Sequence, residues 1–223
     1  TDISRLMNRM RVSDSVANLR ERCITFFFQA EDGIRDSPVT GVQSVLFRSD
    51  TKFLKASAWR SIDSRKDWLI DIAKQILVNP EPGFFEKKTA RFVSDKLNEL
   101  EIAHDSGIAL TGLKGYLDTQ RSGPTVAVIG ELDSLRVAGH VYVDEETEAA
   151  HACGHHCQLA MMLGVAVGLK ASGVLEGLSG RVALMALPAE EFIDVEHRYG
   201  LHNAGDIEFM AGKQEFLRLG AFD

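Results

Sequence analysis

Arg181-Val-Ala-Leu-Met-Ala-Leu187 is a short apolar run that is followed at once by Pro188-Ala189-Glu190-Glu191. Its content of Val, Leu and Met is typical of a buried strand, and Pro188 ends the pattern. The acidic pair therefore lies just past the carboxyl end of a strand, which is where open α/β sheets bind their ligands. Two adjacent Glu residues are in general more often a solvated turn, so it is this position that favours a functional role.

Residues 125–129 (TVAVI) form a second apolar run and predict another buried strand, which Gly130-Glu131-Leu132-Asp133 follows directly. Two strands therefore bring carboxylates to what we expect to be one edge of a sheet. Helical periodicity over 63–79 and 86–100 predicts two amphipathic helices, and 112–116 predicts a strand or turn. Helices that alternate with buried strands indicate a layered α/β domain.

The cluster His151-Ala152-Cys153-Gly154-His155-His156 precedes residues 158–171, an apolar stretch of helix length. The positive end of a helix lowers the pKa of a nearby thiol and so favours the thiolate. Gly154 allows a sharp backbone turn, so that Cys153 and His155 can converge on one ion. Thiolate, imidazole and Glu oxygens bind Zn²⁺ or a similar divalent ion, and a further Glu beside the ligands can take a proton from water.

Four motifs occur in one order along the chain: NPEPGFFEKKTA at 79–90, GELDSL at 130–135, HACGH at 151–155 and PAEE at 188–191. Through them, residues 63–223 resemble the metal-dependent amidohydrolases of the aminoacylase and carboxypeptidase superfamily, peptidase family M20. The branch with indole-acetyl-amino-acid hydrolases and p-aminobenzoyl-glutamate hydrolase is the most similar. The resemblance implies a layered α/β/α catalytic domain of the zinc-peptidase type, two divalent metal ions, Zn or Mn, and hydrolysis of an amide by water.

The candidate metal ligands are Cys153, His155, Glu191 and Glu131. The first three match ligands of the family by position, whereas Glu131 stands where some relatives have a ligand His. The candidate catalytic residues are Glu190, which matches the general base, and Asp133, which matches an Asp that supports a ligand in those relatives. His156 stands where this branch has Asp or Asn.

The other histidines are weaker candidates. His104 and His140 belong to no repeated spacing, and we expect them at the surface or in loops. His151 opens the family motif and is expected to hydrogen-bond to a ligand rather than bind metal itself. His197 and His202 follow the Glu pair within a polar stretch that has no strand before it, so neither is expected to be a ligand.

Cysteine usage and charge set the expected environment. Cys157 is expected to be a small apolar residue in the first turn of a helix, and Cys23 is isolated, so no disulfide framework is predicted and a reducing, cytoplasmic location is the expectation. The net charge is −7, which argues against a nucleic-acid or anionic-membrane partner. No apolar run reaches eighteen residues, and neither a transmembrane helix nor a secretory signal is predicted.

Residues 1–50 differ from the rest of the chain. Residues 26–49 resemble translated sequencing-adapter DNA, and we treat 1–50 as an artefactual or unstructured segment. Residues 51–223 are expected to be the amino-terminal part of a metallohydrolase catalytic domain without its lid and dimerisation domain. The full-length parent is expected to be a homodimer acting on a small-molecule amide or dipeptide, and this chain by itself an inactive fragment that binds metal weakly.

Two readings of other classes stay open at this point. In the first, Cys153 is the nucleophile of a thiol hydrolase and His155 or His156 is its base. In the second, the cluster is a metal-binding or partner-binding module without catalysis, with an ion in a closed site of four protein ligands. Substrates that fit the sequence are N-acyl amino acids, aminobenzoyl-glutamate-like amides and dipeptides.

Overall fold

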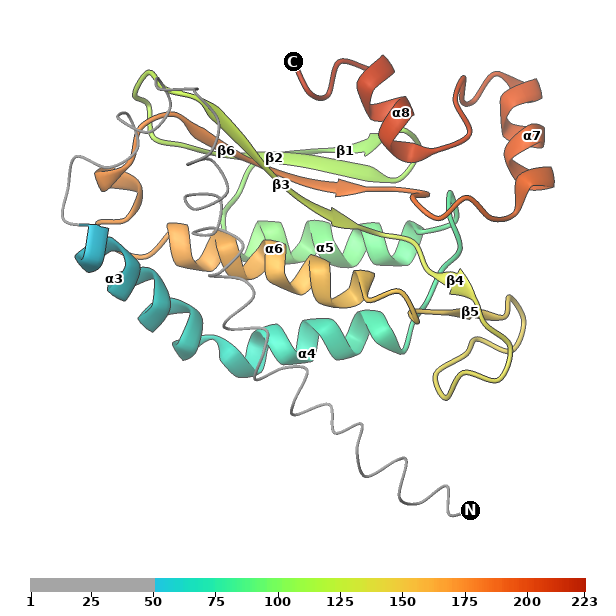
Figure 1. Ribbon diagram of the computed structural model, residues 1–223, viewed down its shortest axis with the longest axis horizontal. Coiled ribbons are helices and arrows are strands. Elements are labelled where there is room, and N and C mark those ends of the chain that lie inside the picture. The colour runs from blue at the N-terminus through green and yellow to red at the C-terminus, as the bar shows by residue number, and fades with distance from the viewer. Residues whose placement is uncertain (1–50) are drawn as a thin grey trace, which may run out of the picture.

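The computed structural model describes residues 51–223 (Figure 1), so the predicted segment 1–50 and Cys23 lie outside the described residues. The helices are α3 (Thr51–Ser64), α4 (Lys66–Leu77), α5 (Lys87–Glu99), α6 (His155–Leu169), α7 (Val195–Ala204) and α8 (Gly212–Arg218), with a 3-10 turn at Leu175–Gly177. The strands are β1 (His104–Ile108), β2 (Gly112–Asp118), β3 (Thr125–Glu131), β4 (Leu135–Arg136), β5 (Ala149–Ala150) and β6 (Arg181–Leu187).

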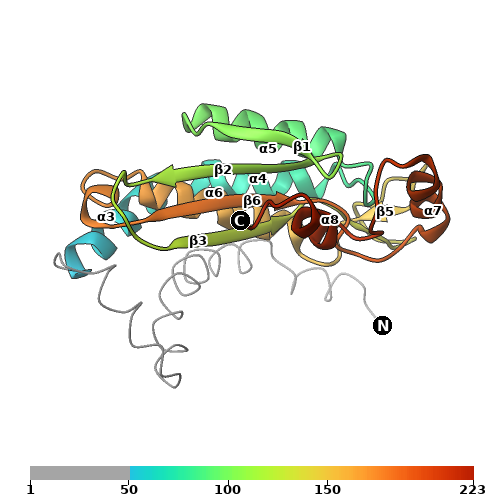
Figure 2. The same cartoon turned by 90° about the horizontal axis from the view of Figure 1, so that it is seen from above.

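The main sheet has four strands in the order β1-β2-β6-β3, as the view from above shows (Figure 2). β1 and β2 form an antiparallel hairpin, and β2 is also antiparallel to β6. β3 and β6 run parallel, with Thr125 opposite Arg181 and Glu131 opposite Leu187. The two predicted strands therefore end at the same edge of the sheet, as the sequence indicated. β4 and β5 form a separate two-stranded ribbon beyond that edge.

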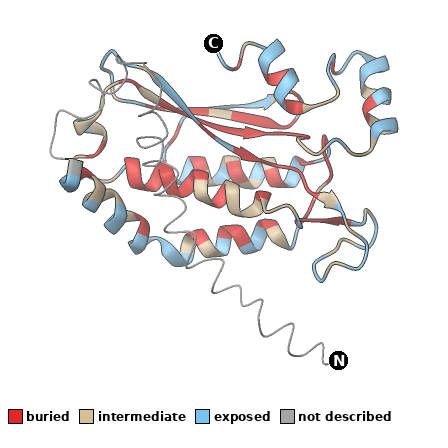
Figure 3. Ribbon diagram, viewed as in Figure 1, coloured by how far each residue is buried: buried red, intermediate tan, exposed pale blue. Residues whose placement is uncertain are grey.

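One face of the sheet is covered by helices α3 to α6 (Figure 1). α6 is apolar on all sides, and eleven of its fifteen residues are buried (Figure 3), as expected for a helix in the interior of a layer. It packs on β3 and on the helices α3 and α4. Gly130 permits the close approach of β3 to α6, since a Cβ there would lie 2.9 Å from Leu159 Cδ2.

The amphipathic helices α4 and α5 close the same layer. α4 buries Leu69, Ile72, Ala73 and Ile76 at helical spacing, and α5 buries Val93 and Leu97. All six belong to the large apolar core between the helices and the sheet. The amphipathic periodicity of 63–79 and 86–100 is thus confirmed, although the first segment is divided at Arg65, where α3 ends and α4 begins.

The opposite face of the sheet carries α8, which packs against β6. Phe216 of this helix is fully buried with Met185 and Leu187 of β6 in a second, smaller cluster. Layers of helix, sheet and helix confirm the predicted α/β class, with α8 as the described part of the second helical layer. None of the helices in residues 51–223 has both the length and the apolar composition that a transmembrane span requires.

One predicted detail was wrong, and two further features were not predicted. The strand predicted over 125–129 as buried is at the edge of the described sheet, where Val126 and Ile129 are about 40% exposed. His104, expected at the surface or in a loop, is half-buried on β1, where its ring contacts Ser94 Oγ and Ile102 O. The polar stretch after Glu191 contains two helices, α7 and α8, that the sequence analysis did not predict.

Candidate metal centre

The candidate site lies at the carboxyl ends of β3 and β6. Glu131 is the last residue of β3, and Leu132 continues the pairing by donating its N–H to Leu187 O at 2.8 Å. Asp133 follows two residues later, while Glu190 and Glu191 follow β6. Because parallel strands end together, four carboxylates from two distant stretches of sequence converge on one place.

His155 lies at the centre of these carboxylates. Gly154 caps α6 with φ +96°, a left-handed conformation that favours glycine, and His155 is the first residue of the helix. Its Nδ1 is 2.8 Å from the carbonyl oxygen of Asp133. Its Nε2 is 2.9 Å from Glu131 Oε2, 3.7 Å from Glu190 Oε2 and 3.9 Å from Glu191 Oε1.

The electrostatics of the site are those of a buried charge cluster. Burial by itself lowers the pKa of His155, but hydrogen bonds with Asp133, Cys153 and Glu131 outweigh it and raise the pKa. Burial likewise raises the pKa of Glu131, and hydrogen bonds from His155 and Lys213 reverse the shift and lower it. The pKa of Glu191 is raised, mainly by burial. His155 and Glu131 thus shift each other's pKa in opposite directions, as a closely paired imidazole and carboxylate do.

Asp133 has a structural place in this cluster. It is fully buried, and its Oδ2 accepts the N–H of Glu191 at 2.8 Å, which ties the two strand ends together. Its Oδ1 lies 3.3 Å from His155 Nδ1 and has no hydrogen-bond partner among the described residues. Asp133 thus links the segment after β6 to His155 through its two carboxylate oxygens.

The donor atoms fit a divalent metal ion in two overlapping groups. The first group is Cys153, His155 and Glu191, and the second is Glu131, His155 and Glu190. Within each group the candidate donor atoms lie within 4.8 Å of one another. Sulfur, nitrogen and oxygen donors of this kind suit zinc, and a carboxylate-rich set also accepts manganese. All six residues singled out in the sequence thus lie together.

Lys213 is the member of the site that the sequence analysis missed. It lies in the first turn of α8, and its Nζ is 2.6 Å from Glu131 Oε1 and 3.1 Å from Glu190 Oε1. Burial disfavours its charged form, but the hydrogen bonds with Glu131 and Glu190 raise its pKa. Nothing in the local sequence marks this lysine, because only the packing of α8 on β6 brings it to the carboxylates.

The turn that carries the Glu pair is strained and firmly held. Ala189 has φ +47°, an uncommon conformation for a residue other than glycine. Its N–H donates to Glu86 Oε1 at 2.7 Å, and its carbonyl oxygen accepts hydrogen bonds from Arg198 Nη1 at 3.2 Å and from the Gly212 N–H at 3.3 Å. Three distant segments therefore fix the residue immediately before Glu190.

Arg198 stabilises the same turn from the interior of the protein. Its side chain is fully buried, between the rings of Phe84 and Phe192, which lie 5.3 and 5.4 Å from its Cζ. It donates to four carbonyl groups, those of Ala189, Glu191, Ile193 and Met210. No sequence signal predicts this role, since a lone Arg in a polar stretch is in most cases exposed.

Glu86 is a fully buried acid on the other side of the turn. Besides the Ala189 N–H, it accepts a hydrogen bond from Thr111 Oγ1 at 2.9 Å. Burial, to which the charge of Asp133 adds, raises the pKa of Glu86 to about 7 against the opposing effect of these hydrogen bonds. Glu86 falls within the family-like motif at 79–90, although that motif did not assign it a role.

The remaining histidines lie beside the site or apart from it. His151 is buried, and neither of its ring nitrogens has a hydrogen-bond partner among the described residues, so the hydrogen bond expected of it is not formed. Its ring is 5.7 Å from that of His156. His197 stacks on Phe85 at 4.1 Å and His202 is exposed in α7, and neither belongs to a candidate metal group. His140 lies in a loop next to Tyr142.

Among the described residues, Cys153 and Cys157 form no disulfide. Cys157 is half-buried and packs against the main apolar core, as expected for a small apolar residue in the first turn of α6.

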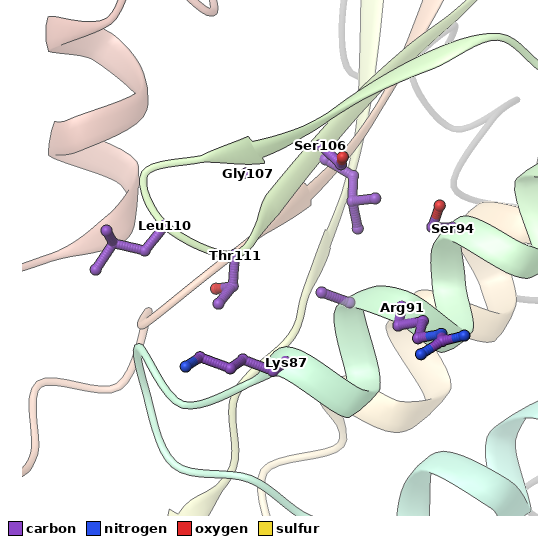
Figure 4. A pocket seen from close by; sticks show the side chains of 9 residues that line it. Lys87, Arg91, Ser94, Ser106, Gly107, Leu110 and Thr111 are labelled. Carbon is purple, nitrogen blue, oxygen red and sulfur yellow. The ribbon is translucent and has the colours of Figure 1, made fainter.

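A pocket of about 300 Å³ lies away from the carboxylates, between α5 and the β1–β2 hairpin (Figure 4). Lys87, Arg91 and Ser94 line it from the helix, and Ser106 lines it from β1. Thr111 is also part of its wall and connects it to the buried Glu86. None of the candidate metal ligands lines this pocket, so it is a separate feature of the surface.

Comparison with known proteins gives consistent matches. IAA-amino acid hydrolase ILR1-like 5 of Arabidopsis thaliana is 34% identical over 128 residues, which cover 56% of this chain and 29% of the plant protein. Thermostable carboxypeptidase 2 of Saccharolobus solfataricus is 35% identical over 130 residues, 56% of this chain and 33% of the archaeal protein. Hippurate hydrolase of Campylobacter jejuni is 30% identical over 164 residues, 67% of this chain and 42% of that protein. The chain thus spans about a third of the length of the curated relatives it matches.

Among solved structures, the fold is similar to that of a dinuclear metal-binding peptidase of the M20 family from Bacillus subtilis. The TM-score is 0.54 at 23% identity, and the match covers 76% of this chain and 41% of the other. At this identity the likeness concerns the fold. No protein-family model matches the chain.

Proposed function

Because this chain is a homologue of amidohydrolases and carboxypeptidases of the M20 type, we propose that it contributes the candidate metal centre of a metal-dependent amidohydrolase. The observation that carries this proposal is the convergence of Glu131, Glu190 and Glu191 within 4 Å of His155 Nε2. A structural histidine needs one acceptor for each ring N–H. Three carboxylates around a single ring nitrogen are more acceptors than the imidazole itself requires, whereas they are suitable ligands for a metal ion.

The proposed ligands of the metal are Cys153, His155, Glu191 and Glu131. Divalent ions bound there would lower the pKa of water and polarise an amide carbonyl. Asp133 supports His155, since its carbonyl oxygen accepts a hydrogen bond from Nδ1–H and so leaves Nε2 to face the carboxylates. Two ions, each zinc or manganese, are proposed, because the similar Bacillus subtilis peptidase is described as dinuclear and the donor atoms here form two candidate groups.

Glu190 is proposed as the general base. Its side chain is 31% exposed, so a substrate and a water molecule can reach it. The preceding residue, Ala189, is fixed by its hydrogen bonds with Glu86, Arg198 and Gly212. Glu190 would take the proton of the attacking water and deliver it to the nitrogen of the leaving amine. The C–N bond of the amide breaks, and a carboxylic acid and an amine are the products.

The proposed substrate class follows the names of the relatives. They are described as hydrolases of IAA-amino acids and hippurate and as carboxypeptidases, which supports an N-acyl amino acid, an aminobenzoyl-glutamate-like amide or a dipeptide as the substrate. For the whole protein we propose a homodimer. We also propose that the 223-residue chain alone binds metal weakly and hydrolyses little, since the matched residues make up only about a third of these relatives. Efficient hydrolysis by this chain alone would contradict that statement.

Replacement of Glu190 tests the proposed function. In the intact enzyme, Glu190→Gln should leave the bound metal unchanged and lower kcat by roughly 10²–10⁴-fold, the usual contribution of a general base. Metal content by mass spectrometry and turnover of N-acyl amino acids are the two measurements. Glu196→Gln, an exposed change in the first turn of α7, is the matched control. Retained turnover in Glu190→Gln would remove Glu190 from this role.

A thiol hydrolase with Cys153 as nucleophile remains the competing function. It requires His155 or His156 as the base beside Cys153, whereas Nε2 of His155 faces Glu131, Glu190 and Glu191 within 4 Å. Chelators separate the two readings: activity that is lost with a chelator and restored by Zn²⁺ or Mn²⁺ supports the metal centre. Activity that resists chelators and is abolished by alkylation of Cys153 supports the thiol reading.

A further inference from the structure

We propose that Lys213 is a built-in cation that occupies part of the metal centre in the metal-free protein and competes with a divalent ion for Glu131. This inference rests on the proposed metal site and adds a regulation of its affinity. It is drawn from the contacts of Lys213 Nζ, which bridges Glu131 Oε1 at 2.6 Å and Glu190 Oε1 at 3.1 Å.

The carboxylates need a positive charge in the absence of metal. Glu131, Asp133, Glu190 and Glu191 surround one histidine at the ends of two strands, and like charges at such distances repel one another in a partly buried place. His155 Nε2 contacts Glu131 Oε2, and Lys213 Nζ contacts the other oxygen, Oε1. Lys213 therefore holds together carboxylates that would otherwise separate.

The base of Lys213 is fixed beside the site, but its ammonium is free to leave. Gly212 packs so closely on the strand end that a Cβ there would lie 1.7 Å from Pro188 O. The Lys213 side chain is nevertheless 48% exposed, so its flexible stem can carry the ammonium into water at small cost. A side chain with these properties can give way to a metal ion without any movement of the fold.

Glu131 makes the competition direct. Both of its oxygens are engaged, one by His155 and one by Lys213, and it is among the proposed ligands of the ion. An incoming ion that binds Glu131 must replace the contact of Lys213 with that carboxylate. Each hydrogen bond to a charged group has an appreciable strength, so the presence of Lys213 weakens the apparent affinity for metal.

The test is the affinity of the 223-residue chain for Mn²⁺ and Zn²⁺, measured by calorimetry at one pH with Lys213→Met, Lys213→Gln and Lys213→Arg. The first two variants should bind about tenfold more tightly than the wild type, and Lys213→Arg, which keeps the charge, should not. Lys88→Met, which removes an exposed lysine of α5, is the control for net charge.

Thermal unfolding provides the second readout. The metal-free Lys213→Met protein should melt below the wild type, and saturating metal should raise its Tm by more than it raises that of the wild type. A structural role alone would lower Tm with and without metal alike.

Equal or weaker metal binding by Lys213→Met and Lys213→Gln, in protein that folds, would overturn the role of Lys213 and leave the metal centre standing. If neither the wild type nor any variant binds an ion, both the proposed metal centre and this inference are contradicted. Binding by Lys213→Met but not by the wild type would support both.

Discussion

Glu86 is the residue whose chemistry depends most clearly on the fold. It is fully buried behind the turn that carries Glu190, and its pKa is raised from 4.5 to about 7. The folded protein therefore holds a proton between these pH values that the unfolded chain releases. This contribution to stability is complete below pH 4.5 and is lost as the pH rises through 7, with a total of about 3 kcal/mol.

Glu86→Gln tests this linkage, because Gln keeps the shape of the side chain and cannot ionise. The decline in the free energy of unfolding between pH 4.5 and 8 should be smaller in Glu86→Gln than in the wild type, as measured by urea denaturation at a series of pH values. Glu145→Gln, an exposed loop change, should follow the wild type. Identical pH profiles for wild type and Glu86→Gln would show that Glu86 titrates as an ordinary acid.

Arg198 gives a second prediction at the scale of single residues. Arg198→Met would leave four buried or half-buried carbonyl groups without their donor, and we expect a loss of roughly 3–5 kcal/mol in the free energy of unfolding. Arg198→Lys should recover part of it, since an ammonium reaches fewer carbonyls. Arg60→Met on exposed α3 is the control. If Arg198→Met changes the free energy of unfolding by less than about 0.5 kcal/mol, Arg198 does not stabilise the turn as described.

The sequence predicted which residues gather at the site better than it predicted what holds them there. Cys153, His155 and the Glu pair stand in short motifs whose spacing and flanking strand can be recognised without a structure. Glu86, Arg198 and Lys213 have no such mark, because their partners lie 23 or more residues away in other elements, or on backbone atoms. The proposed roles of the recognised residues remain predictions for experiment.

At the scale of elements, the contact between α8 and the end of β6 decides where Lys213 lies. Gly212→Ala would bring a Cβ within 1.7 Å of Pro188 O, so α8 must shift, and we expect a loss of about 1–3 kcal/mol in the free energy of unfolding. Gly200→Ala in α7 has nothing within 4 Å and should be neutral or slightly stabilising. Equal stability of the two variants in urea denaturation would show that α8 is not docked as described.

The elements were predictable where local pattern and burial agree. β6 is apolar because it lies between β2 and β3 in the sheet, and the amphipathic faces of α4 and α5 follow from their single apolar contact surface. β3 has the same apolar composition as β6, yet it forms an edge of the described sheet, and periodicity cannot distinguish a central strand from an edge strand. β1 was missed because its five residues include Asp, Ser and Gly and are mostly exposed.

At the scale of the whole molecule, one layer of helices and one sheet place all six candidate residues at a single edge. The parallel pair β3 and β6 is the essential feature, because their common end brings Glu131 level with Leu187 and so joins residues some 60 positions apart in the sequence. α6 then presents His155 from its first turn. The central claim of this account is that the resulting cluster binds divalent metal.

Anomalous X-ray diffraction from crystals grown with Zn²⁺ or Mn²⁺ tests that claim most directly. We predict anomalous density at the carboxyl ends of β3 and β6, in contact with His155 Nε2 and with Cys153 or Glu191. Density at other places only, or none at this edge with metal in excess, would contradict the assignment of a metal centre to this protein.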